Sequence, residues 1–374
     1  MDSDANPATF GGMRSIAIVL LFCAPCLLTV ACTSSAEPPE VSEAESAAMI
    51  RGMTLDAVEK PTVEALARLT DLGVAHVTLI PYSFQRRHND PNLDFNPEPG
   101  WYSEGTAAAR ELSVLGDSLG FEIVLKPQVW LGHSDEGDDD EWSATIGFNN
   151  EADWQTWEAN YRTFILHHAQ TAEEIGSPLF VIGTELGNST RERPEFWRAL
   201  IAEVRTVYSG ALTYAANWHD DYELVTFWDA LDYVGVQAYF PLAESSVASR
   251  SVEELRTGWT THKAALQHVA ERTGKPVLFT EIGYRSVPYA AAEPWKWPER
   301  GETTSADTTL QQQLYTAFFE SFWAEDWFAG ALVWKWTIHP EGRRRRWTRR
   351  EGTAIGFSPE GKPAEEVLAG WYKL

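Results

Sequence analysis

Cysteine is almost absent from this sequence, and the main body of the chain has none. The 3 cysteines are Cys23, Cys26 and Cys32, all close to the N-terminus of the 374-residue chain. The body of the chain therefore has no disulfide and no thiolate ligand for a metal. Its stability must come from the burial of a hydrophobic core.

Positive charge is also scarce. The chain has 30 lysines and arginines against 54 aspartates and glutamates, a formal net charge of -24. Binding to nucleic acid requires a positively charged surface, so a nucleic-acid partner is excluded. The sequence also lacks metal-ligand spacing of His, Cys and Asp, a glycine-rich phosphate loop and a G-x-S-x-G elbow. We therefore expect neither a metal nor a cofactor.

Long hydrophobic runs are limited to one near the N-terminus. Arg14 is followed by an apolar run from Ile16 to Val30. A positive charge followed by such a run is typical of an export signal, and the run is too short to span a membrane comfortably. It ends at Thr29-Val30-Ala31-Cys32, which resembles a bacterial lipoprotein cleavage site with Cys32 as the lipidated residue. Leu28 lies one place earlier than that pattern usually has it, and cleavage with simple release is the alternative.

These features divide the chain into three parts. Residues 1–32 are expected to be the export signal, and residues 33–48, which are small, acidic and contain proline, a flexible tether. Residues 49–374 are expected to form one catalytic domain. The protein would be anchored by its lipid to the bacterial cell envelope, at the outer membrane or cell surface, or otherwise secreted. The lipid would be its only membrane contact, and we expect a monomer.

Within the body of the chain, short apolar runs alternate with segments of helical periodicity. Eight runs have the length and composition of buried strands: Ile50–Leu55, His76–Pro81, Glu122–Pro127, Leu179–Gly183, Leu212–Ala216, Tyr233–Ala238, Val277–Thr280 and Ala331–Trp334. Six helices are predicted between them, at 62–72, 104–119, 151–175, 194–208, 251–273 and 310–325. This alternation predicts an α/β fold, a single (β/α)8 TIM barrel with loop insertions on its C-terminal face.

Two glutamates follow predicted strands directly. The fourth strand ends VIGTELG and the seventh ends LFTEIGY, which places Glu185 and Glu281 on the face where barrel enzymes have their active sites. Two facing carboxylates suit glycosidic bond cleavage, because one can donate a proton while the other attacks the anomeric carbon. A separation of about 5 to 5.5 Å would imply retention of configuration, and about 6.5 to 9.5 Å inversion.

The segments around these glutamates resemble glycoside hydrolase family 113. The resemblance lies in GTELG, FTEIGY, VLKPQVWL, ADWQTWEANYRTFILHHA and GFSPEGKPAEEVLAGWY, and runs from about Gly52 to the C-terminus. That family belongs to a retaining clan of (β/α)8 enzymes and is represented by endo-β-1,4-mannanases. The resemblance implies that Glu185 is the acid/base and Glu281 the nucleophile.

The same resemblance assigns two supporting residues. Tyr239, after the sixth strand, would hydrogen-bond Glu281, and Trp334, at the end of the eighth, would form the floor of the sugar site. Many members of the clan have asparagine before the acid/base, where it holds the sugar 2-hydroxyl, and here Thr184 occupies that place. The choice between manno- and gluco-configured substrates therefore stays open.

Other residues at strand ends are candidates for substrate binding. For each the alternative is a structural role, such as a buried ion pair or the packing of a loop. The set is Lys126, Asn217, Trp218, His219, Tyr82, Gln85 and Tyr284, followed by Gln128 and Trp130. Trp295 and Trp297, in a loop after Tyr284, are predicted to form a platform for further sugars, with packing of the loop as the alternative.

The resulting hypothesis is a retaining endo-glycoside hydrolase that acts on β-1,4-mannan or a related β-linked polysaccharide or oligosaccharide. Three alternatives stay open. One is a hydrolase of the same clan for another β-glycan, such as glucan or xylan. Another is a transglycosylase, and the third is a surface lipoprotein that binds carbohydrate without cleaving it.

Overall fold

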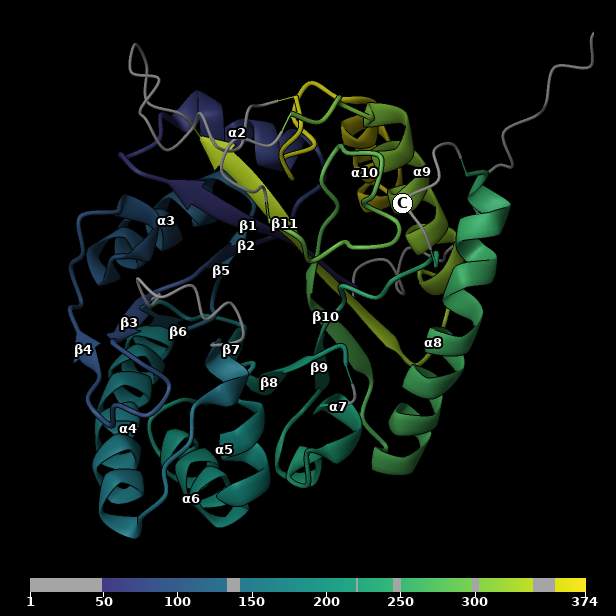
Figure 1. Ribbon diagram of the computed structural model, residues 1–374. Helices are drawn as coiled ribbons and strands as arrows, with labels where there is room; N and C mark the ends of the chain where they lie inside the picture. The colour runs from purple at the N-terminus through teal and green to yellow at the C-terminus, as the bar shows by residue number, and fades with distance from the viewer. Residues whose placement is uncertain (1–48, 133–141, 220, 245–249, 298–302, 339–353) are drawn as a thin grey trace, which may run out of the picture. The chain divides into compact units, whose positions relative to one another are not determined.

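Eight parallel strands form a closed barrel at the centre of the protein (Figure 1). The computed structural model describes residues 49–132, 142–219, 221–244, 250–297, 303–338 and 354–374, so the predicted export signal and tether lie outside the described residues. The barrel order is β1-β11-β10-β9-β8-β7-β5-β2. Its strands are β1 Ile50–Ala57, β2 His76–Leu79, β5 Glu122–Leu125, β7 Leu179–Thr184, β8 Ala211–Asn217, β9 Val234–Gln237, β10 Val277–Ile282 and β11 Phe328–Ile338. All eight predicted strands are confirmed, and with them the (β/α)8 barrel.

Helices surround the barrel. The six predicted ones are confirmed: α2 Val63–Asp71, α3 Thr106–Leu119, α4 Glu151–Glu174, α6 Pro194–Val204, α8 Val252–Thr273 and α9 Thr308–Phe322. Local sequence sets several of their starts. At α8, the Ser251 hydroxyl accepts from the backbone N–H of Glu254, while the Glu254 side chain accepts from the N–H of Ser251. This reciprocal cap satisfies two of the backbone donors that a helix start leaves unpaired.

Shorter elements complete the described chain. They are α5 Gly187–Glu192, α7 Asp221–Leu224, α10 Pro363–Tyr372 and the 3-10 helices η1 Tyr102–Glu104, η2 Ser143–Thr145 and η3 Trp228–Ala230. The last helix, α10, was not predicted. It joins the C-terminal segment to the first strand, because the Tyr372 hydroxyl donates to the Gly52 carbonyl at 2.9 Å and Arg51 donates to the Tyr372 carbonyl at 2.6 Å.

A second, three-stranded sheet lies next to the barrel and was also not predicted. It consists of β3 Tyr82–Gln85, β4 Asp94–Phe95 and β6 Gln128–Leu131, in the order β4-β3-β6. Pro81 and Pro127 separate β3 and β6 from the barrel strands before them, because proline has no N–H to contribute to a ladder. β3 and β6 pair in parallel after the ends of the barrel strands that precede them, so their side chains lie beyond the rim of the barrel.

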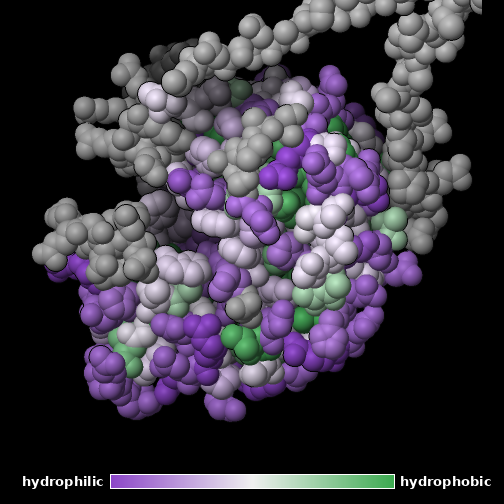
Figure 2. All heavy atoms as spheres, turned by 45° about the vertical axis from the view of Figure 1, so that its right-hand side comes forward, coloured by the Kyte–Doolittle hydropathy of each residue, from purple (hydrophilic) through white to green (hydrophobic). Residues whose placement is uncertain are grey.

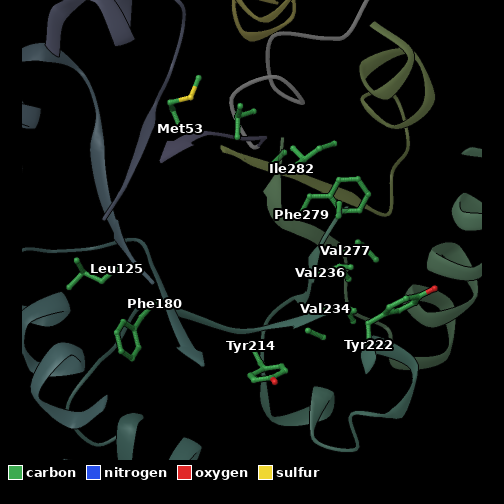
Figure 3. Packing of buried hydrophobic residues seen from close by; sticks show 14 of the residues in the cluster. Met53, Leu125, Phe180, Tyr214, Tyr222, Val234, Val236, Val277, Phe279 and Ile282 are labelled. Carbon is green, nitrogen blue, oxygen red and sulfur yellow. The ribbon is translucent and has the colours of Figure 1, made fainter. Parts of the chain in front are cut away.

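The interior and exterior of the barrel differ in polarity. One small apolar cluster contains residues from five strands: Ile50, Val124, Leu179, Leu278 and Leu332. A larger cluster lies outside, between strands and helices, and Figure 3 shows Val277 and Phe279 of β10 beside Val234 and Val236 of β9 in that layer. The Phe279 ring packs edge-on against Phe322 of α9 at 5.0 Å. The core therefore lies mostly between the sheet and the helices. This leaves the C-terminal end of the barrel interior available for polar side chains.

No helix in the described part of the chain is long and apolar enough to cross a membrane. The face shown in Figure 2 is mostly hydrophilic with scattered hydrophobic side chains.

Candidate active site

Glu281 points into the barrel because β10 is irregular. Val277 and Phe279 belong to the outer core, whereas Leu278 belongs to the small apolar cluster formed by the strands, so the side chains of β10 alternate regularly at first. The pairing of β10 shifts register after Phe279 with both β9 and β11. A bulge of this kind re-aims a side chain, and such bulges are frequent next to active sites. Both Thr280 and Glu281 consequently contact side chains at the end of β9.

Three donors surround the Glu281 carboxylate, which is 5% exposed. The Lys126 ammonium and the Gln128 amide both donate to Oε1, the latter at 3.1 Å. The Tyr239 hydroxyl donates to Oε2 at 2.8 Å. An ionised carboxyl group only accepts hydrogen bonds, so this set of donors suits a carboxylate ion. The predicted contact between Tyr239 and Glu281 is present.

Of the two ionisable donors, Lys126 is fully buried and Tyr239 is partly buried. Burial lowers the pKa of Lys126, and the neighbouring Glu281 carboxylate opposes that change. Burial also raises the pKa of Tyr239 well above its usual range, and Glu281 adds to the rise. Tyr239 is therefore a neutral hydrogen-bond donor at neutral pH.

Glu185 lies in a different environment. Burial, and then the nearby charge of Glu281, raise the pKa of Glu185 to about 7, while a hydrogen bond from Asn217 and the charge of Lys126 act in the opposite direction. The Asn217 amide donates to Oε1 of Glu185 at 2.7 Å. Glu185 thus keeps its proton to a pH at which an ordinary glutamate is fully ionised.

The backbone at Glu185 is also unusual. Its φ is 51°, in the left-handed region, and among the described residues no other non-glycine residue has a positive φ. Such a conformation costs about 1–3 kcal/mol and persists where the surrounding structure enforces it. Here the N–H of Glu185 donates to the Ala215 carbonyl at 2.9 Å and that of Leu186 to the Tyr214 hydroxyl at 2.6 Å. These two bonds hold the turn that presents the carboxyl group.

A group of aromatic side chains lies beside Glu281. Trp334, 8% exposed, packs with Ile80 and Phe357, and Tyr82 and Tyr239 pack against this cluster. Tyr82 in turn contacts Trp130 edge-on at 5.6 Å, and Trp130 is 52% exposed. The structure therefore brings Tyr82, Tyr239 and Trp334 together around the predicted nucleophile.

A second aromatic group begins next to Asn217, the residue that bonds Glu185. Trp218 directly follows Asn217, and its ring stacks on Trp295 with centroids 5.0 Å apart. His219 contacts the same ring edge-on at 5.3 Å. Trp295 is 41% exposed, so the stacked pair offers an aromatic surface to solvent. Whether Trp295 forms part of a platform for further sugars, as the sequence predicts, or only packs its loop stays open.

Two predicted binding residues are buried among other protein groups. Gln85 is fully buried, its Oε1 accepts from the Trp157 indole at 3.0 Å, and its Nε2 donates to the Arg87 carbonyl at 2.9 Å. Tyr284 is also fully buried and packs edge-on against Tyr315 of α9. Both side chains are fully buried, which favours the structural alternative for them, and their contact with substrate stays a prediction. Position after a strand does not fix the direction of a side chain.

The sequence reasoning missed two charged residues near the site. Asp56 belongs to β1 and Lys335 follows Trp334 in β11, and their side chains pair at 2.7 Å. Asp56 is close enough to Tyr82 to contribute to the raised pKa of that phenol, after burial and Glu281. Both residues lie at ends of predicted strands, so the rule that found the glutamates could also have found them.

No group of three or more His, Cys, Asp or Glu side chains that could hold a metal occurs in the described ranges. The polar groups at the site are two carboxyl groups in different environments with an ammonium, an amide and a phenol. This arrangement can donate a proton from one side and attack from the other.

Comparison with known proteins agrees with this geometry. The sequence profile of Glycoside Hydrolase Family 113 matches residues 54–350. Among solved structures, the family 113 β-mannanase AaManA from Alicyclobacillus acidocaldarius, in complex with ManMIm, is 27% identical with a TM-score of 0.70, over 87% of this chain and 97% of that one. A family 113 β-1,4-mannanase is 25% identical, also with a TM-score of 0.70, over 87% and 99% of the two chains.

More distant structures share only the fold. A β-glucuronidase from Ruminococcus gnavus is 13% identical with a TM-score of 0.58, over 87% of this chain and 50% of that one. A search of curated protein sequences finds no match. The extent of the family profile, more than half of the chain, decides the family. The chain belongs to glycoside hydrolase family 113 and is a glycoside hydrolase.

Proposed function

We propose that the protein is a retaining endo-β-1,4-mannanase, with Glu281 as nucleophile and Glu185 as acid/base. The observation that carries this proposal is the contrast between the two carboxyl groups. Glu281 accepts hydrogen bonds from Lys126, Gln128 and Tyr239, whereas the pKa of Glu185 is raised to about 7. One group is prepared to attack and the other to give a proton.

The first step forms a covalent intermediate. A Glu281 oxygen bonds to the anomeric carbon while the glycosidic C–O bond breaks, and the proton of Glu185 moves to the departing oxygen. In the second step Glu185 takes a proton from water, the water oxygen bonds to the anomeric carbon, and the bond to Glu281 breaks. Two displacements at the same carbon restore the original configuration.

The electrostatics favour this change of role. The charge of Glu281 is the second largest cause of the raised pKa of Glu185. Once Glu281 is esterified its charge is gone, so the proton affinity of Glu185 falls and the group can act as a base. The same carboxyl group thereby serves as acid in the first step and base in the second.

Mannan is proposed as substrate because the two most similar structures described above are named β-mannanases. Trp334 packs with the phenol that bonds Glu281, and Trp218, which stacks on Trp295, follows the asparagine that bonds Glu185. Aromatic surfaces near each glutamate support binding within a chain rather than at its end. This is what internal cleavage of a polysaccharide requires.

A panel of polysaccharides tests the substrate. Release of reducing ends from mannan, glucomannan, cellulose and xylan would be measured, and the products from defined oligosaccharides analysed by length. We expect rapid cleavage of mannan into mixed short products. Faster cleavage of cellulose or xylan would favour another β-glycan, and products longer than the substrate would favour transglycosylation.

Proton NMR of the first product tests the mechanism, because the β-anomer must form first if configuration is retained.

The cellular location is proposed from the N-terminal sequence alone. The apolar run ending at Cys32 supports export followed by lipid attachment. Fractionation of cells that produce the full chain should place the wild type in the membrane fraction and Cys32→Ser outside it. Recovery of both in the soluble exported fraction would instead indicate cleavage and release.

A further inference from the structure

A charged pair lies at the rim of the barrel outside the catalytic pair. Asp56 of β1 and Lys335 of β11 are paired at 2.7 Å, with side chains 17% and 12% exposed. The Asp56 carboxylate also accepts from the Trp101 indole at 3.1 Å and from the Thr337 hydroxyl at 3.4 Å. These three donors fix the position of a carboxylate that is still accessible to solvent.

Aromatic rings surround the same pair. The Lys335 ammonium lies 5.1 Å from the ring centroid of Trp334 and 5.6 Å from that of Trp297. Trp297 is 52% exposed and contacts Phe357 at 5.6 Å. The flat, exposed ring of Trp297 is the kind of surface on which a pyranose stacks.

The position of this group relative to the glutamates is set by the barrel. Strands β1 and β11 are neighbours, and β11 is next to β10, which carries Glu281. Trp334 packs in one cluster with Tyr239, the phenol bonded to Glu281. Glu185 follows β7 and Asn217 ends β8, and neither of these strands is next to β1, β10 or β11 in the barrel.

The proposed roles convert this position into a direction along the substrate. Glu281 bonds to the sugar that the enzyme retains, whereas Glu185 protonates the oxygen of the part that leaves. The group around Asp56 and Lys335 adjoins Trp334 and is closer in the barrel order to Glu281 than to Glu185, which favours the retained side.

We propose that Asp56, Lys335 and Trp297 form a subsite for the second pyranose on the retained, non-reducing side of the scissile bond. The inference rests on the proposed function. Adjacent hydroxyls of one sugar would donate to the Asp56 carboxylate and accept from the Lys335 ammonium, while the apolar face of the ring packs on Trp297. Glu104, whose pKa burial and then Asp56 raise to about 7, lies close to the same carboxylate.

Nitrophenyl glycosides separate this subsite from the rest of the site. The nitrophenyl group is the leaving group, so 4-nitrophenyl β-mannobioside differs from the β-mannoside only by one sugar on the retained side. The ratio of kcat/KM for the two substrates measures what that sugar contributes. Loss of a charge-assisted hydrogen bond or of a stacking contact should lower the ratio by about tenfold in Lys335→Met and in Trp297→Ala.

Lys263→Met is the matched control. Lys263 of α8 pairs with Glu325 at 2.5 Å, the two side chains are 30% and 33% exposed, and neither belongs to the proposed subsite. The ratio of kcat/KM values for the two substrates in Lys263→Met should equal that of the wild type.

A purely structural brace between β1 and β11 would lower the melting temperature of Lys335→Met and leave the ratio unchanged. Trp297→Ala should fold normally because that side chain is exposed, so ratios within about twofold of wild type in both variants overturn the proposal.

Failure of the subsite and failure of the proposed function give different results. If the wild type cleaves no mannan in the polysaccharide panel, the proposed function fails. If it cleaves mannan but neither mannoside, binding decides the subsite. β-1,4-Mannotetraose would be titrated into Glu281→Ala, with and without Lys335→Met, by calorimetry. Binding about tenfold weaker in the double variant supports the subsite, and equal binding, or none in either variant, overturns it.

Discussion

Asn217 holds Glu185 through a hydrogen bond of 2.7 Å from Nδ2 to Oε1. The Asn217 amide is itself fixed, because its Oδ1 accepts the backbone N–H of His219 at 2.9 Å. This donor lowers the pKa of Glu185 against burial and the charge of Glu281, which together raise it to about 7. The proton affinity of the acid is thus a balance between groups from three strands, and each can be changed separately.

The pH dependence should report this balance. Glu185 must be protonated to act as the acid, so kcat/KM should fall as pH rises through about 7. Asn217→Ala removes a contact that lowers the pKa, so it should move this alkaline limb to higher pH while reducing the maximum rate. The measurement is the pH profile of kcat/KM on mannotetraose. A limb displaced to lower pH would contradict the described electrostatics.

Glu185→Ala should depend strongly on the leaving group. Natural glycan oxygens need a proton to depart, so cleavage of mannan should fall by about 10²–10⁴-fold. A dinitrophenyl β-mannoside has a leaving group that departs without one, and its first step should be affected far less. Steady-state and burst kinetics with both substrates make the comparison. Equal losses on both substrates would show that Glu185 is not the proton donor.

Tyr239→Phe removes only the hydroxyl that donates to Oε2 of Glu281 at 2.8 Å. The ring, and with it the packing against Trp334, is kept. Loss of one aligned donor in an active site typically costs about 10²–10³ in kcat, so we expect a loss of that order in kcat with little change in melting temperature. Tyr233→Phe, at the start of β9, is a control that should keep normal kcat. A Tyr239→Phe enzyme of normal kcat would exclude a role for this hydroxyl.

Gly183 precedes the turn that carries Glu185, and any larger residue there would collide. A β-carbon at this position would lie 2.7 Å from both the Trp197 ring and the Tyr161 hydroxyl. Gly183→Ala should therefore destabilise the protein by about 1–3 kcal/mol, measured by denaturant unfolding. Gly100→Ala meets no atom within 4 Å and should be neutral. Equal stabilities for the two variants would contradict the close packing behind β7.

Most of the fold could be predicted because the barrel repeats one simple pattern. Each of the eight strands is a short apolar run, and each C-terminal end lies on the same face. That rule alone placed Glu185 and Glu281 near each other, together with Lys126 and Asn217. The alternation of runs and helical segments carries this information without any knowledge of side-chain contacts.

Directions beyond the strand ends could not be predicted in this way. The bulge after Phe279 turns Glu281 inward, and regular alternation would have turned it outward. Gln85 follows a predicted strand, yet it belongs to a second sheet and bonds to Trp157. Such outcomes depend on pairing and packing between segments far apart in the chain, which local sequence patterns do not contain.

The most direct test of the mechanism is to trap the intermediate. Wild-type enzyme would be incubated with 2-deoxy-2-fluoro-β-mannosyl fluoride, which forms the glycosyl-enzyme readily and releases it slowly, and the digested protein analysed by mass spectrometry. The account predicts one added sugar on the peptide that contains Glu281, and none in Glu281→Gln. An added sugar on any other residue, or inverted product with no labelled peptide, would contradict it.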